Sequence, residues 1–306
     1  MKRCIILNPW AGRGTAGQRQ GELEQALRTH GVAFDLVTTH ARGGATELTY
    51  QALIRGYQQI IAVGGDGTIN EIVNALADGR ERTSRPPALG IVPIGTGSDF
   101  IKMLDTFEAN DIDSAVRRIA NGHTRSIDLG RMTVETKNDE RTRYFINGLG
   151  MGIDAQVAVE SLKLTRLKGL AVYLVAVIRA LTIYRANPMT VHFDEREVRH
   201  RLLFTTVANG RCQGGGFWMT PEAILDDGLL DICTVDNMRL DEIIRYIPRL
   251  MEGTHTTLRQ VTMGRARHVE VTSNTPIPVA TDGEVVATHA HRVVVDVVPG
   301  AIDIIV

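Results

Sequence analysis

The segment Gly64-Gly65-Asp66-Gly67-Thr68 has the residue types of a phosphate-binding turn. Glycines let backbone amides approach a polyphosphate without a Cβ in the way. An apolar run precedes the turn and Ile69–Ala77 follows it with helical spacing, so the positive end of a helix would face the same ligand. An aspartate fits an anion site when a cation bridges it to the phosphates, which suggests Mg²⁺ at Asp66. The alternative is a tight turn with an aspartate cap.

A second glycine-rich segment, Pro93–Phe100 (PIGTGSDF), also follows an apolar run. If both runs are parallel strands, both segments lie at the carboxyl edge of one sheet, where α/β folds bind their ligands. Neither segment contains GxxxxGK[ST], so the sequence is not that of a P-loop enzyme.

A third pattern, Gly12-x-Gly14-x-x-Gly17 with Asp35 further on, has the outline of a dinucleotide-binding fingerprint. In its details the pattern departs from that fingerprint. Residues 8–11 separate the first strand from Gly12, and Asp35 falls inside its apolar run rather than at the end. A glycine-rich loop for another phosphate ligand is therefore favoured over a Rossmann-type NAD(P) site.

The elements that must position these loops alternate regularly over the first 130 residues. The expected strands are Cys4–Leu7, Phe34–Val37, Ile60–Val63 and Leu89–Val92, and the expected helices are Glu22–Arg28, Thr46–Ile54 and Ile69–Ala77. Strands and helices that alternate at this spacing predict right-handed crossover connections between parallel strands. We therefore expect an α/β domain over residues 1–130, built on a doubly wound, mostly parallel sheet.

The pattern changes in residues 131–306, where most segments are short stretches in which apolar and polar residues alternate. The expected strands are Met189–Phe193, Leu202–Val207, Leu229–Val235, His268–Thr272 and Arg292–Val297, with helices at Lys168–Arg185 and Leu240–Met251. Asp-Gly pairs at 227–228 and 282–283 predict hairpin turns. This half is expected to be an antiparallel sandwich or barrel with attached helices, and residues 298–306 could pack back on the first domain.

Composition excludes several classes of protein. The 306 residues carry 34 basic and 35 acidic side chains, so no strongly basic surface is expected and nucleic acid is not an expected partner. Three widely spaced cysteines without a CxxC motif argue against a disulfide framework or a zinc site and fit a reducing cytoplasm. The longest apolar stretch, Gly169–Ile178, is shorter than the ~20 residues that a spanning helix needs. A cytoplasmic protein is expected.

Seven segments occur in an order that is typical of one group of enzymes. They are Asn8–Gly12, Gly64–Glu71, Gly95–Phe100, Ile127–Gly130, Asn147–Asp154, Leu225–Asp231 and Asp282–Glu284. The ordered set resembles the diacylglycerol-kinase catalytic-domain family, which includes soluble bacterial lipid kinases and the related sphingosine and ceramide kinases. GGDGT alone is shared with NAD kinases, but the ordered set covers almost the whole chain.

The resemblance implies an ATP-binding α/β domain, an antiparallel β-sandwich domain for the lipid substrate, and a set of site residues. The residues that would contact ATP are Asn8, Thr39, Gly64, Gly65, Asp66, Gly67, Thr68, Ile69, Asn70, Thr96 and Asp99. Asp66, with Asp99 and Asp128, would organise the catalytic Mg²⁺, and Glu284 would be the catalytic base with Asp282 beside it. A structural Mg²⁺ would be held by the Asp227 side chain and the carbonyls of Ile224 and Leu229. Ser98 stands where the family usually has asparagine, so a direct contact from that side chain is in doubt.

The expected function is an ATP- and Mg²⁺-dependent lipid kinase that transfers the γ-phosphoryl group to a lipid hydroxyl, with diacylglycerol as acceptor and phosphatidic acid as product. The alternatives are an NAD kinase-type phosphotransferase, a Rossmann-type NAD(P)-binding enzyme and a nucleotide-binding protein without turnover. The expected partner is a lipid alcohol at a membrane surface, and a homodimer is left open.

Peripheral membrane association has one candidate segment, Gly169–Tyr184, which is apolar. Cations border it at Lys163, Arg166, Lys168, Arg179 and Arg185. Such a segment suits a membrane surface, but a core helix with cations at its ends explains it too and is favoured.

Overall fold

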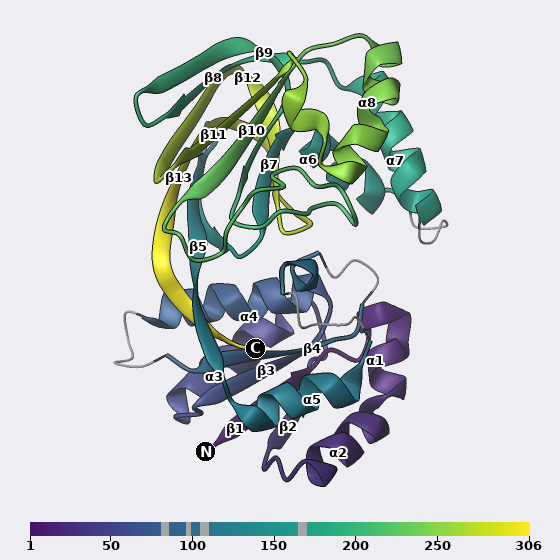
Figure 1. Ribbon diagram of the computed structural model, residues 1–306, viewed down its shortest axis with the longest axis vertical. Coiled ribbons are helices and arrows are strands. Elements are labelled where there is room, and N and C mark those ends of the chain that lie inside the picture. Colours follow the sequence, from purple (N-terminus) through teal and green to yellow (C-terminus); the bar gives the residue numbers. More distant parts are fainter. Residues whose placement is uncertain (81–85, 96–98, 105–109, 165–169) are drawn as a thin grey trace. The chain divides into compact units, whose positions relative to one another are not determined.

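The computed structural model describes residues 1–80, 86–95, 99–104, 110–164 and 170–306 of the chain (Figure 1). These residues form two compact units. Unit 1 comprises Met1–Leu129 and Pro299–Val306, and unit 2 comprises Gly130–Val298. Two long strands, β5 (Thr124–Glu135) and β13 (Glu284–Ile305), contribute residues to both units.

Unit 1 is built on a parallel sheet. Its strands are, in spatial order, β2 (Asp35–Thr38), β1 (Arg3–Leu7), β3 (Gln59–Gly64), β4 (Ala88–Pro93) and the end of β13. All six residues of β3 are buried, as expected for a central strand covered on both faces. The four predicted strands are confirmed, and each predicted end lies within one residue of the observed one.

Helices flank this sheet (Figure 1). They are α1 (Thr15–Gln18), α2 (Gln20–Thr29), α3 (Gly44–Ile54), α4 (Asp66–Gly79) and α5 (Ile112–Asn121). Helices α2 and α5 share one core cluster through Leu23, Leu27 and Ile112, whereas α3 packs against α4. The predictions for α2, α3 and α4 are confirmed, but α5 was not predicted. Its start is marked by Asp111, whose carboxylate accepts the Ser114 amide at 3.0 Å.

Unit 2 is an antiparallel β-sandwich, as predicted. Besides β5 and β13, its strands are β6 (Glu140–Phe145), β7 (Gly148–Gly152), β8 (Asn187–Phe193), β9 (Arg196–Ala208), β10 (Leu230–Asp236), β11 (Val261–Ala266) and β12 (His268–Thr281). Adjacent strands pair antiparallel from β11 through β10, β9, β7 and β12 to β13. Alternate side chains of these strands, such as Leu149, Ile232 and Val279, form a fully buried core.

The helices of unit 2 are α6 (Ile153–Leu162), α7 (Leu170–Ile183) and α8 (Leu240–Glu252). The predictions for α7 and α8 are confirmed, whereas α6 was not predicted. Arg166 and Lys168, two of the cations assigned to the apolar segment, lie outside the described residues. Across the described part of the chain, every helix is too short or too polar to span a bilayer.

One of the two predicted Asp-Gly hairpins is confirmed. Asp282 and Gly283 join β12 to β13 in a two-residue turn, with φ values of +45° and +80°, and Thr281 pairs with Glu284 across it. Positive φ at both turn residues is the geometry that favours Asp-Gly in tight hairpins.

The hairpin predicted at Asp227-Gly228 is wrong. Strands β9 and β10 are antiparallel neighbours, but residues 209–229 connect them as one long irregular segment. Within it, the Asp227 Oδ1 accepts the Leu229 amide at 3.0 Å, which forms an Asx turn. The same residue pair therefore reverses the chain locally without joining two strands directly.

All three cysteines, Cys4, Cys212 and Cys233, are buried and unbridged. Burial raises the pKa of the Cys4 thiol to about 11, and the nearby Asp35 carboxylate adds to that shift. Burial likewise raises the pKa of Cys233 to about 12.

Candidate active site

The carboxyl ends of the unit 1 strands carry several of the predicted ATP-contacting residues. Asn8 follows β1, and its side-chain amide donates to the Thr68 Oγ1 at 3.0 Å. Thr39 follows β2, where it is buried and its amide bonds the Leu7 carbonyl at 2.9 Å. The structure thus brings the ends of β1 and β2 to the same sheet edge as the Gly64–Thr68 turn, because parallel neighbours end together.

The Gly64–Thr68 turn connects β3 to α4. The Gly65 carbonyl accepts the amides of Thr68 and Ile69 at 3.0 and 3.2 Å, which closes the first helical turn. A Cβ on Gly64 would lie 2.5 Å from the Thr68 Oγ1, so this position has no room for a side chain. A Cβ on Gly67 would have no neighbour within 4 Å. The turn is therefore packed on its strand side and open over the start of the helix.

Asp66 connects this turn to the second glycine-rich segment. Its two carboxylate oxygens accept the backbone amides of Asp99 and Phe100 at 3.3 and 3.4 Å. The Asp99 carboxylate in turn accepts from the Lys102 ammonium at 2.9 Å. Two predicted magnesium-organising aspartates thus lie beside one another. Thr96 and Ser98 lie outside the described residues.

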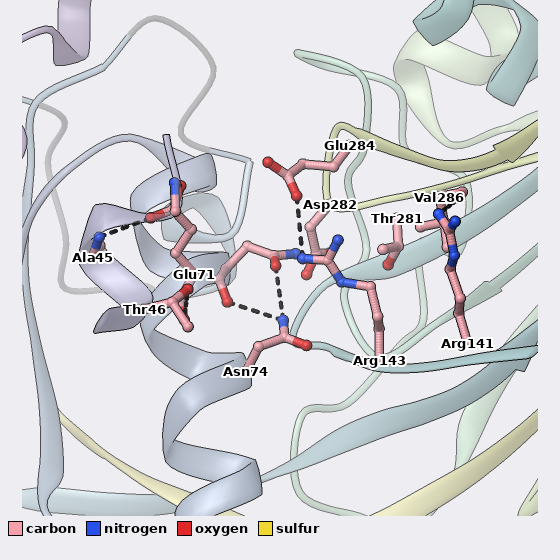
Figure 2. A network of polar contacts seen from close by, with 12 residues as sticks. Ala45, Thr46, Glu71, Asn74, Arg141, Arg143, Thr281, Asp282, Glu284 and Val286 are labelled. Atoms are coloured by element: carbon pink, nitrogen blue, oxygen red, sulfur yellow. Dashed lines mark hydrogen bonds and ion pairs between the residues drawn. The ribbon is translucent and has the colours of Figure 1, made fainter. Parts of the chain in front are cut away.

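The start of α4 also organises the loop after β2, through a residue that was not among the predicted site residues. The two carboxylate oxygens of Glu71 accept the amides of Gly43 and Ala45, each at 2.9 Å, and Thr46 donates to the Glu71 carbonyl (Figure 2). The first amides of a helix have no carbonyl partner within the helix, and here the Glu71 carboxylate accepts hydrogen bonds from those at the start of α3. Glu71 is therefore a positioning residue for the loop that contains Thr39.

Asp128 has a different environment from the other predicted magnesium ligands. It is buried in β5, and its Oδ1 accepts the Gly300 amide at 2.8 Å, which ties β5 to the returning end of β13. Among the described residues, no group of three or more His, Cys, Asp and Glu side chains is arranged to hold a metal ion. Mg²⁺ in kinases usually takes one or two carboxylates together with phosphate oxygens and water, so a protein-only cage is not required.

The dinucleotide fingerprint is not reproduced by the structure. Asp35 is the first residue of β2, and its carboxylate accepts from the Tyr57 hydroxyl at 2.6 Å. The start of a parallel strand lies at the sheet edge opposite to the carboxyl ends. Asp35 is therefore placed away from the glycine loops, where it cannot bind the ribose of a dinucleotide held by them.

In unit 2, Asp282 clamps the chain between β6 and β7. Its Oδ2 accepts the Ile146 amide at 3.0 Å, and its Oδ1 accepts the amides of Asn147 and Gly148 at 3.2 and 2.9 Å. A carboxylate that binds three successive amides is well suited to fix the hairpin tip. The family resemblance implies that Asp282 lies beside the base, and these contacts indicate how Asp282 would position Glu284.

Glu284, the predicted base, is the first residue of β13. The Glu284 Oε2 lies 3.3 Å from the guanidinium of Arg143 on β6 (Figure 2). Of the Glu284 side-chain surface, 16% is exposed to solvent. The carboxylate is thus held on one side and accessible to solvent on the other. Arg143 was not singled out in the sequence, because nothing in the chain links it to a residue of a distant hairpin.

Two polar side chains at the segment that Asp282 binds lie over glycines. A Cβ on Gly148 would come 2.0 Å from the Gln213 amide nitrogen, and one on Gly210 would come 1.9 Å from the Asn147 Oδ1. Among the described residues these two polar atoms have no hydrogen-bond partner. Buried polar groups without partners are costly, so both are candidates for contacts with a bound substrate. The glycines were the available sequence signal, but they do not say which side chains cover them.

The three residues predicted to bind a structural metal lie in the 209–229 connection. Asp227 is held by its Asx turn with Leu229, and Ile224 is partly exposed nearby in the chain. The neighbouring Asp231 pairs with Arg265 at 3.1 Å. Burial raises the pKa of Asp231, and the charges of Asp227 and Glu222 add to the shift, which indicates a locally acidic segment.

Asp154, at the start of α6, is a titratable group with a strongly shifted pKa. Its carboxylate lies over Gly150, where a Cβ would be 2.0 Å away, and accepts the Ala155 amide at 2.8 Å. Burial raises the pKa of Asp154 to about 7. The folded chain therefore holds this proton more tightly than the unfolded chain, in which an aspartate has a pKa of about 3.9.

This shift predicts that the free energy of unfolding falls as the pH rises from about 4 to about 7, by up to about 1.4 kcal/mol per pH unit. Below that window both states bind the proton, and above it neither does. Asp154→Asn removes the dependence, so the melting temperature of the variant relative to the unsubstituted protein should rise between pH 4.5 and pH 8. Circular dichroism melts of both proteins at several pH values measure the difference. A difference independent of pH would contradict the prediction.

Comparison with known proteins adds family relationships to this geometry. The family model of the diacylglycerol kinase catalytic domain matches residues 2–132, and that of the YegS C-terminal NAD kinase beta sandwich-like domain matches residues 148–306. A diacylglycerol kinase of Staphylococcus saprophyticus is 30% identical over 281 residues, which are 92% of this chain and 88% of that protein. A diacylglycerol kinase of Bacillus subtilis is 29% identical over 286 residues, 93% of this chain and 90% of that protein.

Solved structures resemble the whole chain in fold. A putative diacylglycerol kinase from Bacillus anthracis superposes with a TM-score of 0.79 at 24% identity and covers 99% of this chain and 94% of its own. Yeast NADH kinase complexed with NADH superposes with a TM-score of 0.52 at 11% identity and covers 99% of this chain and 82% of its own. At these identities the likeness concerns the fold alone.

Proposed function

Because the chain belongs to the diacylglycerol kinase family and is a lipid kinase, we propose that it transfers the γ-phosphoryl group of ATP to the free hydroxyl of a diacylglycerol, with phosphatidic acid as the product. The observation that carries the proposal is the Gly64–Thr68 turn, which is packed against its strand and open over the helix start. Phosphoryl transfer depends on positioning and charge neutralisation more than on covalent help from the protein.

The proposed donor site lies at the first turn of α4. Amides at the start of a helix have no helical carbonyl to bond, and Gly67 leaves open space beside them that phosphate oxygens could occupy. Asn8 holds the Thr68 hydroxyl, and Glu71 holds the loop of Thr39. These contacts would keep the turn rigid before the nucleotide arrives.

The carboxylate oxygens available in unit 1 are ligands that suit a magnesium ion. The Asp66 carboxylate lies at the start of α4 and accepts the backbone amide of Asp99, and we propose that these two aspartates hold Mg²⁺ together with the phosphates, with Asp128 as a further residue of the set. When bound, the ion neutralises charge on the phosphate oxygens. In the absence of substrate, the amides of Asp99 and Phe100 keep the Asp66 carboxylate in place.

The acceptor step is proposed to use Glu284. The lipid hydroxyl oxygen bonds to the γ-phosphorus, the bond from that phosphorus to the β–γ bridging oxygen breaks, and ADP leaves with the electron pair. The hydroxyl proton passes to the Glu284 carboxylate. Arg143 orients this carboxylate, and Asp282 holds the turn that carries it. The proposal requires both units to act on the same pair of substrates.

We also propose that the 224–229 segment holds a structural Mg²⁺ through Asp227 and the carbonyls of Ile224 and Leu229. Support comes from the acidic surroundings and from the Asx turn that fixes Asp227. Oxygen ligands of this kind suit Mg²⁺.

The glycines of the turn provide a test of the donor site that separates folding from binding. Gly64→Ala should displace Thr68 and lower the stability by about 1–3 kcal/mol. Gly67→Ala should leave the melting temperature unchanged or raised, because alanine favours helices. It should nevertheless raise the KM for ATP about tenfold, since its methyl group would stand where the phosphates approach. Thermal melts and initial rates decide this, and an unchanged KM in Gly67→Ala would count against the donor site.

The activity itself is tested with ATP labelled in the γ-phosphate. Purified full-length protein is incubated with Mg²⁺ and mixed micelles of diacylglycerol, and in parallel with monoacylglycerol, sphingosine, ceramide and soluble NAD⁺. Label should enter phosphatidic acid, and EDTA should abolish the transfer. NAD⁺ is included because the fold is shared with yeast NADH kinase. Transfer to NAD⁺ alone, or to none of the acceptors with folded protein, would refute the proposal.

A further inference from the structure

Arg143 on β6 contacts the proposed base with only part of its hydrogen-bonding capacity. A guanidinium has five N–H donors that lie in one plane. One of its terminal nitrogens, Nη2, donates to the Glu284 Oε2 at 3.3 Å. Among the residues that the structure describes, this guanidinium has no other hydrogen-bond or ion-pair partner. Because 34% of the Arg143 side chain is exposed to solvent, its remaining donors are available to a ligand.

A second arginine of the same strand, Arg141, has the contacts of a structural residue (Figure 2). It donates to the Asp139 carboxylate at 2.6 Å and to the Val286 carbonyl of β13 at 3.4 Å. The second of these contacts joins β6 to β13, and neither involves a residue of the proposed reaction. The partner of Arg143, by contrast, is the carboxylate that the proposed reaction protonates.

The proton transfer proposed for Glu284 changes the charge beside Arg143. While the carboxylate is ionised, it balances the charge of the guanidinium. Once the carboxylate has accepted the proton of the lipid hydroxyl it is neutral, and the guanidinium loses its counter-charge. The transition state of phosphoryl transfer spreads negative charge over the oxygens of the moving group in the same step. A cation is therefore released from its partner when a new anionic partner forms beside it.

We propose that Arg143 exchanges partners during the reaction, from the Glu284 carboxylate to the transferring phosphoryl group and then to the phosphate of the lipid product. Arg143 neither gains nor loses a proton, and only its hydrogen bonds change. A planar guanidinium suits this role because two of its donors match two oxygens of a phosphate. The interaction is stronger in the transition state than in the resting protein, so it lowers the barrier.

The inference rests on the proposed function, because the proposed acceptor step brings a phosphoryl group to Glu284. It goes beyond that function in making Arg143 a catalytic residue as well as the group that orients the base. The competing interpretation is that Arg143 acts only through Glu284, as a positioning residue. The two interpretations differ in what remains of the effect of Arg143 when the Glu284 carboxylate is absent.

Initial rates with mixed micelles of diacylglycerol provide the first test. Arg143→Gln should lower kcat about a hundredfold, the usual cost of removing one donor to a developing charge, and leave the KM for ATP unchanged. Arg143→Lys should retain more activity, because lysine keeps the charge but lacks the planar donors. The matched control is Arg141→Gln, whose kcat should remain that of the unsubstituted protein. Circular dichroism melts compare the folding of the variants, and Arg143→Lys replaces Arg143→Gln if the latter unfolds.

The double variant Arg143→Gln with Glu284→Gln separates a direct contact from positioning. If Arg143 only orients the Glu284 carboxylate, its replacement should cost nothing further once that carboxylate is gone. If Arg143 contacts the phosphoryl group, the double variant should be slower than Glu284→Gln alone by about tenfold or more. Equal kcat values in Glu284→Gln and in the double variant would overturn the inference.

Binding of the product gives a readout that needs no turnover. A short-chain phosphatidic acid, dissolved below its critical micelle concentration, is titrated into the full-length protein in a calorimeter without ATP. Arg143→Gln should raise its Kd about tenfold. Glu284→Gln should lower the Kd, because it removes a carboxylate that repels the phosphate and competes for the guanidinium. The matching diacylglycerol, which lacks the phosphate, should bind both variants alike. An unchanged Kd for phosphatidic acid in Arg143→Gln would contradict the inference.

The rate and binding measurements together distinguish failure of this inference from failure of the proposed function. If the unsubstituted protein phosphorylates no acceptor, the proposed function fails, whereas product binding still decides whether Arg143 holds a lipid phosphate. If the protein phosphorylates diacylglycerol and Arg143→Gln keeps its full kcat, the proposed function stands and the exchange of partners is rejected.

Discussion

Glu284→Gln should lower kcat at least about a hundredfold, the usual contribution of a general base. Glutamine has the same shape and can still contact Arg143, so folding should be preserved, but it cannot accept the proton of the lipid hydroxyl. The KM for ATP should remain unchanged, because the substitution does not touch the proposed donor site. Initial rates with mixed micelles of diacylglycerol measure both quantities.

A matched control is available in the same unit. Glu270 also pairs with an arginine, Arg292, at 2.6 Å on β12. Glu270→Gln should therefore reproduce any general effect of breaking a glutamate–arginine pair while leaving kcat intact. Equal rates in Glu284→Gln and the unsubstituted protein would show that the proton is accepted elsewhere.

Asp66→Asn should have an effect of similar size, because one charge beside the phosphates is worth about a hundredfold or more in rate. The asparagine oxygen can still accept the Asp99 amide, but its NH2 group cannot accept the Phe100 amide, so the contact between the two glycine-rich segments should be weakened rather than lost. The concentration of Mg²⁺ needed for half-maximal activity should rise as well. Magnesium titrations of the initial rate measure both effects.

Asp78→Asn is the control on the same helix. The Asp78 carboxylate accepts from the Tyr50 hydroxyl at 2.8 Å, near the other end of α4. Its removal should change neither the rate nor the magnesium requirement. If Asp66→Asn kept the magnesium requirement of the unsubstituted protein, Asp66 would have no part in holding the ion.

The strands and loops of unit 1 could be predicted because each is encoded locally. A strand buried on both faces is a continuous apolar run, and the glycines after it mark the turn. Helix α5 had equally local signals, the Asp111 cap and the periodic Ile112 and Ile119, and could have been found.

Contacts between distant segments could not be predicted in this way. The Asp-Gly pair at 227–228 carries the same local signal as the pair at 282–283, and only the neighbouring strands decide which becomes a hairpin tip. The three amides that Asp282 accepts belong to residues 146–148, and the partner of Glu284 is Arg143. No local pattern joins these segments, because the pairing exists only once the sandwich has formed.

The burial of all three native thiols has a practical consequence. With their pKa values raised, Cys4 and Cys233 remain protonated near neutral pH, and Cys212 is equally shielded. A single cysteine introduced at position 54, where the isoleucine is 87% exposed, would then be the sole rapidly alkylated site, so a fluorophore could be attached there selectively. Such labelling would not require removal of the native sulfhydryls first.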